Sequence, residues 1–167
     1  MTTTIDTLDS ASARVLLEGY GPGAWHGPDL KAALADVGDD LAFWRPAAGR
    51  HTIAEITLHH AYCVRGVFAK LTGADPGPFV LDGDDWFDAA DGSRLSWTAI
   101  KEEVAREQTR LAAASADVAN RRIASPLSPP ERFDLILGIT CHAVYHAGQV
   151  QLIKKLHEGV AERRGTR

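Results

Sequence analysis

The chain has 167 residues, enough for one domain with a single hydrophobic core but fewer than two independent cores usually need. Its hydrophobic fraction of 45% and charged fraction of 24% are those of an ordinary globular protein, which argues against disordered, collagen-like or fibrous coiled-coil chains. With 18 Lys and Arg against 22 Asp and Glu, the net charge of −4 provides no basic surface for a phosphate backbone, so we expect no nucleic-acid partner.

The N-terminal stretch MTTTIDTLDSASARVLLEGYG lacks the basic and apolar regions of a signal peptide, and no run of about 18 apolar residues follows. We therefore expect a cytoplasmic protein that does not bind membranes. The two cysteines, Cys63 and Cys141, each lie in an apolar helical pattern, which favours buried thiols over a disulfide.

The first half of the chain contains signals for two long helices. Apolar residues at helical spacing predict a helix over residues 5–20, which ends at the glycines and the proline that follow. Residues 24–51 are interpreted as a connection that holds one short helix, with Pro28 in its first turn. A second long helix is predicted from Thr52 to about Leu71, because Thr52 and Glu55 form a capping-box pattern and Gly73 follows the last turn.

Residues 73–93 are too long and too rich in Gly, Pro and Asp for a tight turn, so we interpret them as an acidic, solvated crossover. The only stretch in the chain with some character of a strand is PFVL, at residues 78–81. A third long helix with one apolar stripe is predicted over residues 96–118.

The last helix is predicted to begin at Pro129, because Ser128 can cap it and Glu131 completes a second capping-box pattern. We expect it to end near residues 157–158, before Gly159. Four long helices with one long connection between the second and third predict an all-α single domain over residues 1–167, a four-helix bundle with a crossover.

Two histidines, His142 and His146, lie on the inward stripe of the last helix, between Ile139 and Val150. Residues four apart project from adjacent turns on the same side, so the two imidazoles can converge on one cation. Buried imidazole nitrogens without partners would cost a few kcal/mol, roughly 1–3 each. The pair therefore either finds polar partners in the core, or binds a metal with a third ligand from another helix.

The second long helix offers two adjacent histidines as that third ligand. His60 lies at the centre of an apolar stripe that includes Ile56 and Val64, whereas His59 lies on its shoulder with Cys63. Periodicity favours His60, but the apolar face of a bundle helix is wide enough for either residue to reach the site.

The segments TIAEITLHHA, at residues 52–61, and GITCHAVYHAGQVQLIKK, at residues 138–155, resemble the DinB-like metal-binding proteins of the DinB/YfiT superfamily. In that family the second bundle helix carries an acidic residue four before a ligand histidine, and the last helix carries HxxxHxGQ. The resemblance covers most of the chain and implies a metal site of His59, His142 and His146. It implies that His60 is a helix residue packed against neighbours or against a dimer surface.

Three imidazole ligands would leave coordination positions open for water or substrate, as in catalytic sites. They suit zinc, nickel, iron(II) or copper better than magnesium or calcium, and we expect Zn²⁺ first and Ni²⁺ next. The resemblance adds that some DinB-like enzymes use a low-molecular-weight thiol. We therefore expect a metal-dependent transferase or hydrolase that acts on a small molecule, with such a thiol as a candidate cofactor.

Two alternatives stay open at this point. The protein is a non-catalytic metal-binding bundle that acts as a sensor, a stress protein or a partner-binding protein, or its histidines are only polar core residues. A homodimer is expected from the resemblance and from spare apolar surface on a small bundle.

Three further residues are catalytic candidates: His26, Glu55 and Gln149. Glu55 can orient His59 or act as a base, although the capping box alone explains it. Gln149 can donate to a bound ligand or be a core amide bonded to the backbone. His26 can cover the open side of the metal as a proton carrier, or be an exposed loop histidine.

Two residues beside these candidates have their own interpretations. Cys63, one turn after His59, is a fourth ligand if deprotonated and otherwise a buried thiol. Tyr145 is interpreted as a core aromatic with a polar tip.

Overall fold

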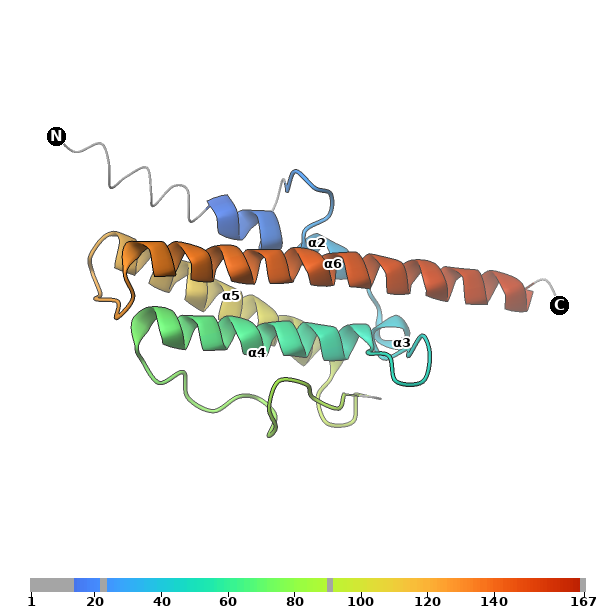
Figure 1. Ribbon diagram of the computed structural model, residues 1–167. Coiled ribbons are helices and arrows are strands. Elements are labelled where there is room, and N and C mark those ends of the chain that lie inside the picture. The colour runs from blue at the N-terminus through green and yellow to red at the C-terminus, as the bar shows by residue number, and fades with distance from the viewer. Residues whose placement is uncertain (1–13, 22–23, 90–91, 166–167) are drawn as a thin grey trace.

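The computed structural model describes residues 14–21, 24–89 and 92–165, and in these ranges every regular element is a helix. Three long helices, α4 (Ile53–Thr72), α5 (Trp97–Ala119) and α6 (Pro129–Gly165), run side by side (Figure 1). Two short helices, α2 (Leu30–Leu34) and α3 (Asp39–Ala42), precede α4, and residues 14–20 form a further helical segment. The all-α prediction is confirmed, whereas residues 5–13 of the first predicted helix lie outside the described residues.

Helix α4 has the ends that its sequence predicts. The Thr52 hydroxyl accepts from the Glu55 N–H at 3.1 Å, and the Glu55 carboxylate accepts from the Thr52 N–H at 3.0 Å, which completes the capping box. At the other end Gly73 has φ +72°, a left-handed conformation that glycine adopts without the steric cost of a Cβ. Because α4 packs against both α5 and α6, these fixed ends set the register of the bundle.

Helix α6 begins as predicted but does not end as predicted. The Ser128 N–H and hydroxyl both donate to the Glu131 carboxylate, at 2.7 and 2.6 Å, next to the first helical residue. The prediction that the helix ends before Gly159 is wrong, because α6 continues to Gly165. A single glycine inside a helix costs only about 1 kcal/mol, and the Ala, Glu and Arg residues after it favour the helix.

The connection before α4 also differs from its prediction. It holds two short helices instead of one, and Asp29 caps α2 by accepting from the Ala32 N–H at 3.1 Å, so Pro28 precedes the cap and is not in the first turn. Residues 14–20 pack against α6 through Gly19, where a Cβ would lie 2.9 Å from the Ala143 Cβ. Only glycine therefore permits this close approach.

The crossover between α4 and α5 runs along the side of α4 as irregular chain (Figure 1). Residues 78–81 form no strand. The aspartates of the crossover that the structure describes are exposed, as expected of a solvated acidic loop. Phe87 and Ala89 are nevertheless buried, and Phe87 packs edge-on against Tyr62 of α4. Its aromatic side chains supply the apolar area that holds it on the bundle.

The buried apolar residues of the long helices form two clusters, one at each end of the bundle. On α5, Val104 belongs to the first cluster and Leu111 to the second. Between these levels the interior is polar and contains His60 of α4 and His142 of α6. The bundle therefore places its histidines in a layer between two hydrophobic clusters. In the described part of the chain no helix is both long and apolar enough to cross a membrane.

Candidate metal centre

Three histidine nitrogens converge between α4 and α6. The Nε2 atom of His142 lies 3.1 Å from the Nε2 atom of His59 and 3.1 Å from the Nε2 atom of His146. Imidazole nitrogens that share one zinc ion at 2.0–2.1 Å stand about 3.0–3.4 Å apart. The spacing therefore fits one transition-metal ion, and His59, His142 and His146 form a candidate metal-binding group.

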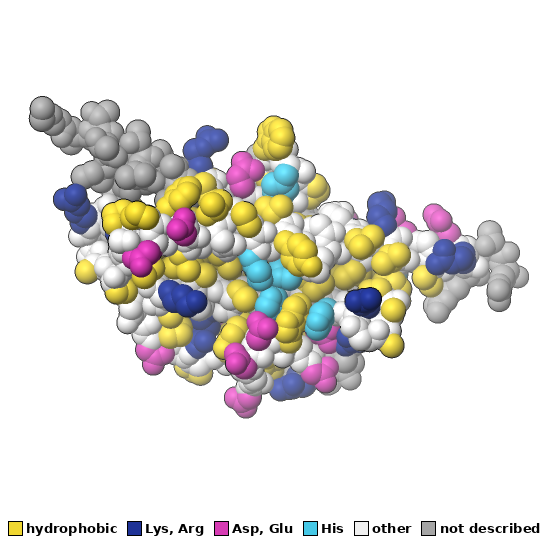
Figure 2. Space-filling model, in the orientation of Figure 1, with side chains coloured by type: hydrophobic (Ala, Val, Ile, Leu, Met, Phe, Trp, Pro, Cys, Tyr) yellow, Lys and Arg dark blue, Asp and Glu magenta, His cyan; other side chains and the backbone are white. Residues whose placement is uncertain are grey.

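The two helices deliver these rings for simple geometric reasons. His142 and His146 are one turn apart on α6, so their rings lie on the same face of the helix. His59 projects from α4, which packs against α6. Figure 2 shows histidine side chains gathered in the middle of one face of the molecule, bordered by hydrophobic and acidic side chains. Only 7% of the surface of His59 and 2% of that of His146 is exposed. The centre therefore lies just below the molecular surface, with its ligand rings largely shielded from solvent.

The outer nitrogens of two of these rings are bonded to oxygen atoms. His59 Nδ1 lies 2.9 Å from the carbonyl oxygen of Asp85 and 3.1 Å from its carboxylate, and His146 Nδ1 lies 2.6 Å from Oε1 of Gln149. These oxygens can only accept, so each Nδ1 carries the hydrogen and each Nε2 presents a lone pair to the centre. Partners of this kind are typical of metal-ligating histidines.

Two rings of the centre, His142 and His146, are held neutral by their surroundings. Burial, followed by the charges of His146 and His59, lowers the pKa of His142 to about 4. Burial also lowers the pKa of His146, although the hydrogen bond that His146 donates to Gln149 opposes this shift. Neutral imidazoles are the form that binds metal, so burial keeps His142 and His146 in the charge state that a cation requires.

We expect the metal-free protein to lose stability as the pH falls from about 6.5 to about 4. The unfolded chain takes up a proton on His142 near its ordinary pKa of 6.5, whereas the folded protein takes it up only near its pKa of about 4. Between these values the unfolded state binds more protons, so the free energy of unfolding decreases with decreasing pH. Because His142 is partly exposed, we expect a loss on the order of 1–2 kcal/mol from this residue.

Urea unfolding of chelator-treated protein at pH 7.5 and pH 4.5 measures this loss. His142→Gln, which cannot titrate in this range, should reduce the difference between the two pH values. An equal difference in both proteins would show that His142 is not the group responsible.

A tryptophan from the crossover covers one side of the centre. The Trp86 ring stacks on His59, with ring centroids 4.0 Å apart and an angle of 4° between the planes, and its other face stacks on His51 at 3.7 Å. Its neighbour Asp85 has φ +61°, a left-handed conformation that aspartate adopts more readily than most residues. Asp85 in this conformation accepts the hydrogen bond from His59 Nδ1–H through its carbonyl oxygen.

Asp85 and Trp86 were not among the candidate residues from the sequence. They lie in the acidic stretch DGDDW, whose spacing does not fit a calcium loop and carries no other ligand pattern. The tryptophan next to these aspartates is an apolar signal, but it does not indicate which helix the loop covers.

The three catalytic candidates have different positions in the structure. Gln149 accepts from the ring of His146 through its side-chain oxygen, so it can position that ring. His26 is exposed and its Nε2 contacts the carbonyl of Glu18 at 2.7 Å, which favours the exposed-loop alternative over a position that covers the metal. The side chain that lies against the centre is Trp86, which stacks on His59.

Glu55 is committed to the start of α4. Besides the capping box it pairs with Arg45, at 2.5 Å, and with His51, at 3.4 Å. Burial alone would raise the pKa of Glu55, but the bonds from Arg45 and from the Thr52 N–H outweigh burial and lower it. A carboxylate stabilised in this way is a poor base, and the partner of His59 Nδ1 is Asp85, so these contacts favour the capping-box interpretation of Glu55 over an orienting role.

Cys63 and Tyr145 complete the surroundings. The Cys63 sulfur lies 3.9 Å from His59 Nε2, and burial, followed by the charge of Asp85, raises the pKa of its thiol to about 11. His59, Cys63 and Asp85 form a second, overlapping candidate group. The interpretation of Tyr145 as a core residue is wrong, because 65% of its surface is exposed.

His60 lies inside the bundle and not at a surface. None of its surface is exposed, and its Nδ1 lies 2.9 Å from the Nδ1 atom of His142. His142 turns its Nε2 atom to the centre and its Nδ1 atom to His60. His60 therefore contacts a proposed ligand without belonging to the ligand set. The expectation of a dimer-surface position for His60 is therefore wrong, and its packing against neighbours is confirmed.

The helical fold and this arrangement of three histidines define an all-α protein with a candidate metal centre between two of its long helices. The sequence model of the DinB superfamily matches residues 24–150, which include all the residues of the centre. The chain belongs to the DinB superfamily. Comparisons with curated proteins and with solved structures found no match.

Proposed function

We propose that this DinB protein binds one divalent transition-metal ion through His59, His142 and His146 and is a transferase or hydrolase for a small molecule. The observation that carries the proposal is the convergence of three Nε2 atoms, two of which have their Nδ1 hydrogens committed to oxygen acceptors. Three neutral donors leave coordination positions for water or substrate, and Zn²⁺ or Ni²⁺ suits them best. When bound, such an ion would supply Lewis acidity that favours ionisation of water or of a thiol.

The residues around the centre support a reaction there. Trp86 and the crossover shield His59 from one side. The Asp85 carboxylate, 59% exposed and 3.1 Å from His59 Nδ1, can accept the proton that a thiol or a water molecule releases. For thiol transfer, a sulfur–carbon bond forms on the electrophile and its leaving group departs with the bonding electrons.

A cavity of about 330 Å³ lies beside the centre and is suited to a small molecule. Two of its lining residues connect it to the centre: His51 stacks on Trp86, and Gln149 is bonded to His146. Leu152 and Leu156 of α6 supply an apolar wall, and Arg50 supplies a cationic group. We propose that a substrate or thiol with an apolar body and an anionic group binds here.

We expect the zinc or nickel form to accelerate the reaction of a low-molecular-weight thiol with an electrophile, or the hydrolysis of an activated ester. The purified protein, without an affinity tag, is mixed with glutathione, bacillithiol or mycothiol and 1-chloro-2,4-dinitrobenzene, or with 4-nitrophenyl acetate. His146→Ala should reduce the rate to background because it removes a proposed ligand, and His26→Ala should leave it unchanged.

The second candidate function is a non-catalytic metal-binding bundle that acts as a sensor, a stress protein or a partner-binding protein. The observation that favours it is the coverage of the centre, since His146 is almost fully buried and Trp86 lies flat on His59. Stoichiometric metal without turnover of any thiol or ester would support this candidate over the enzyme.

The homodimer and the cytoplasmic location stay predictions. Large apolar side chains on the outer face of α6 are the surface on which we propose that a second copy packs. The exposed members of this face outside the proposed substrate cavity are Phe133, Leu137 and Tyr145.

A further inference from the structure

His60 lies in a short chain of polar contacts that leads away from the candidate metal centre. Its Nδ1 lies 2.9 Å from the Nδ1 atom of His142, and its Nε2 lies 2.8 Å from the side-chain amide nitrogen of Gln108 on α5. His60 is fully buried, so both of its ring nitrogens depend on these partners. The contacts link α6, α4 and α5 in the polar layer between the two hydrophobic clusters.

This chain sets His142 apart from the other two proposed ligands. The Nδ1 atoms of His59 and His146 face oxygens, which can only accept, so the tautomers of these rings are fixed. The Nδ1 atom of His142 faces another imidazole nitrogen, which either donates or accepts. The tautomer of His142 therefore depends on the tautomer of His60, and that tautomer depends on Gln108.

This chain of polar contacts has two self-consistent arrangements of its hydrogen atoms. In the first, the Gln108 amide N–H donates to His60 Nε2, and His60 Nδ1–H donates to His142 Nδ1. The hydrogen of His142 is then on Nε2, where it blocks metal binding. In the second, His142 Nδ1–H donates to His60 Nδ1, and His60 Nε2–H donates to the Gln108 side-chain oxygen. His142 Nε2 then offers a lone pair to the centre. Each ring keeps one hydrogen in both arrangements, so the change releases no proton.

We infer that His60 and Gln108 are positioning residues that control metal affinity by setting the tautomer of His142. This inference rests on the proposed metal site and names its regulation. The orientation in the structure, with the amide nitrogen of Gln108 toward His60, is the first arrangement. Metal binding selects the second, which requires the amide to turn over and reverses both hydrogen bonds.

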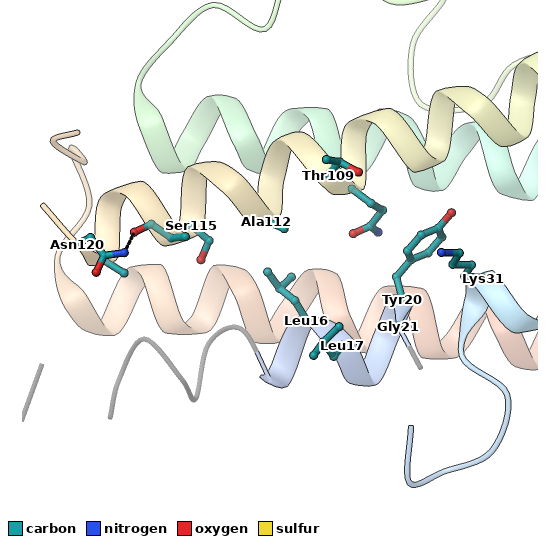
Figure 3. Close-up of a pocket in the computed structure, with 12 residues that line it drawn as sticks. Leu16, Leu17, Tyr20, Gly21, Lys31, Thr109, Ala112, Ser115 and Asn120 are labelled. Carbon is teal, nitrogen blue, oxygen red and sulfur yellow. Dashed lines mark hydrogen bonds between the residues drawn. The ribbon is translucent and has the colours of Figure 1, made fainter. Parts of the chain in front are cut away.

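The surroundings of Gln108 permit this turn. Gln108 is half-buried and lines a cavity of about 430 Å³ between α5 and the residues that precede α2. Figure 3 shows this cavity, with Leu16 and Tyr20 on one side and Thr109 and Ala112 of α5 on the other. Gln108, at the outer end of this chain of contacts, therefore borders open space, whereas His60 is packed inside the bundle.

Zinc affinity of Gln108 variants tests the inference. Gln108→Glu has nearly the same shape and only accepts, so it favours the second arrangement and should bind Zn²⁺ at least as tightly as the wild type. Gln108→Met has a similar shape but no oxygen to accept from His60 Nε2–H. It should therefore bind Zn²⁺ more weakly than Gln108→Glu. His60→Phe fills the ring volume without a nitrogen partner for His142 and should weaken Zn²⁺ binding about 10–100-fold. Competition with a chromophoric chelator measures all three affinities.

A second readout separates tautomer control from a purely structural role. Nitrogen-15 NMR of the histidine rings reports which nitrogen carries the hydrogen. We expect zinc loading to move the hydrogen of His60 from Nδ1 to Nε2. An unchanged His60 tautomer would overturn the inference, and so would equal zinc affinity in the Glu and Met variants of Gln108.

The outcomes also separate this inference from the proposed function. A wild-type protein that binds no Zn²⁺ or Ni²⁺ would contradict both. A wild-type protein that binds Zn²⁺ no more tightly than a folded His60→Phe variant would overturn the inference alone. If His60→Phe does not fold, the comparison of the two Gln108 variants decides.

Discussion

Replacing His142 by alanine should abolish stoichiometric metal binding by this protein. The Nε2 atom of His142 lies 3.1 Å from the Nε2 atom of each of the other two proposed ligands. Its Nδ1 atom contacts His60 on the other side of the ring. Its loss leaves two imidazoles from different helices, which bind a divalent ion weakly. We expect a decrease in Zn²⁺ affinity of more than about 100-fold, beyond the effect typical of residues that only support a ligand.

Elemental analysis of protein purified without an affinity tag measures the metal content directly. His26→Ala is the matched control, because His26 is exposed and contacts a backbone carbonyl outside the centre, so it should retain the wild-type content. Equal metal in the His142 variant and the wild type would mean that the ion binds elsewhere.

Trp97→Ala should cause a large loss of stability. Trp97 is the first residue of α5 and only 1% exposed, and its indole N–H donates to the carbonyl of Val37 at 2.7 Å. Removing a buried aromatic ring of this size costs about 3–5 kcal/mol, and the Val37 carbonyl also loses its partner. The contact joins α5 to the connection that precedes α4, so the loss should affect the end of the bundle that supports the crossover.

Urea denaturation of the metal-free proteins provides the comparison. Trp25→Ala removes a tryptophan that is 94% exposed, and should change the free energy of unfolding by less than about 0.5 kcal/mol. A loss of under about 1 kcal/mol in Trp97→Ala would show that the ring is not an anchor of the core.

The sequence predicted those parts of the fold whose signals are local. Thr52, Glu55 and Gly73 specify the ends of α4 through bonds within one turn, so the pattern alone was sufficient. Helix α6 shows the limit of such signals, because it continues to Gly165 past its predicted end before Gly159. A single glycine terminates a helix only weakly when helix-favouring residues follow it.

The candidate centre was predictable where it depends on helix periodicity and not where it depends on the crossover. The spacing of His142 and His146 predicted that their rings share one side of α6, and the structure brings them together. Asp85 contacts His59 across 26 residues of chain, and no spacing rule connects two such positions. Periodicity correctly placed His60 in the interior, but its contact with His142 depends on how α4 and α6 pack.

Anomalous diffraction at the zinc or nickel absorption edge, from crystals of the metal-loaded protein, tests the central claim most directly. We predict one strong peak per chain, bonded to the Nε2 atoms of His59, His142 and His146. A peak bonded to Cys63 and Asp85 without His142, or no peak near these histidines, would contradict it.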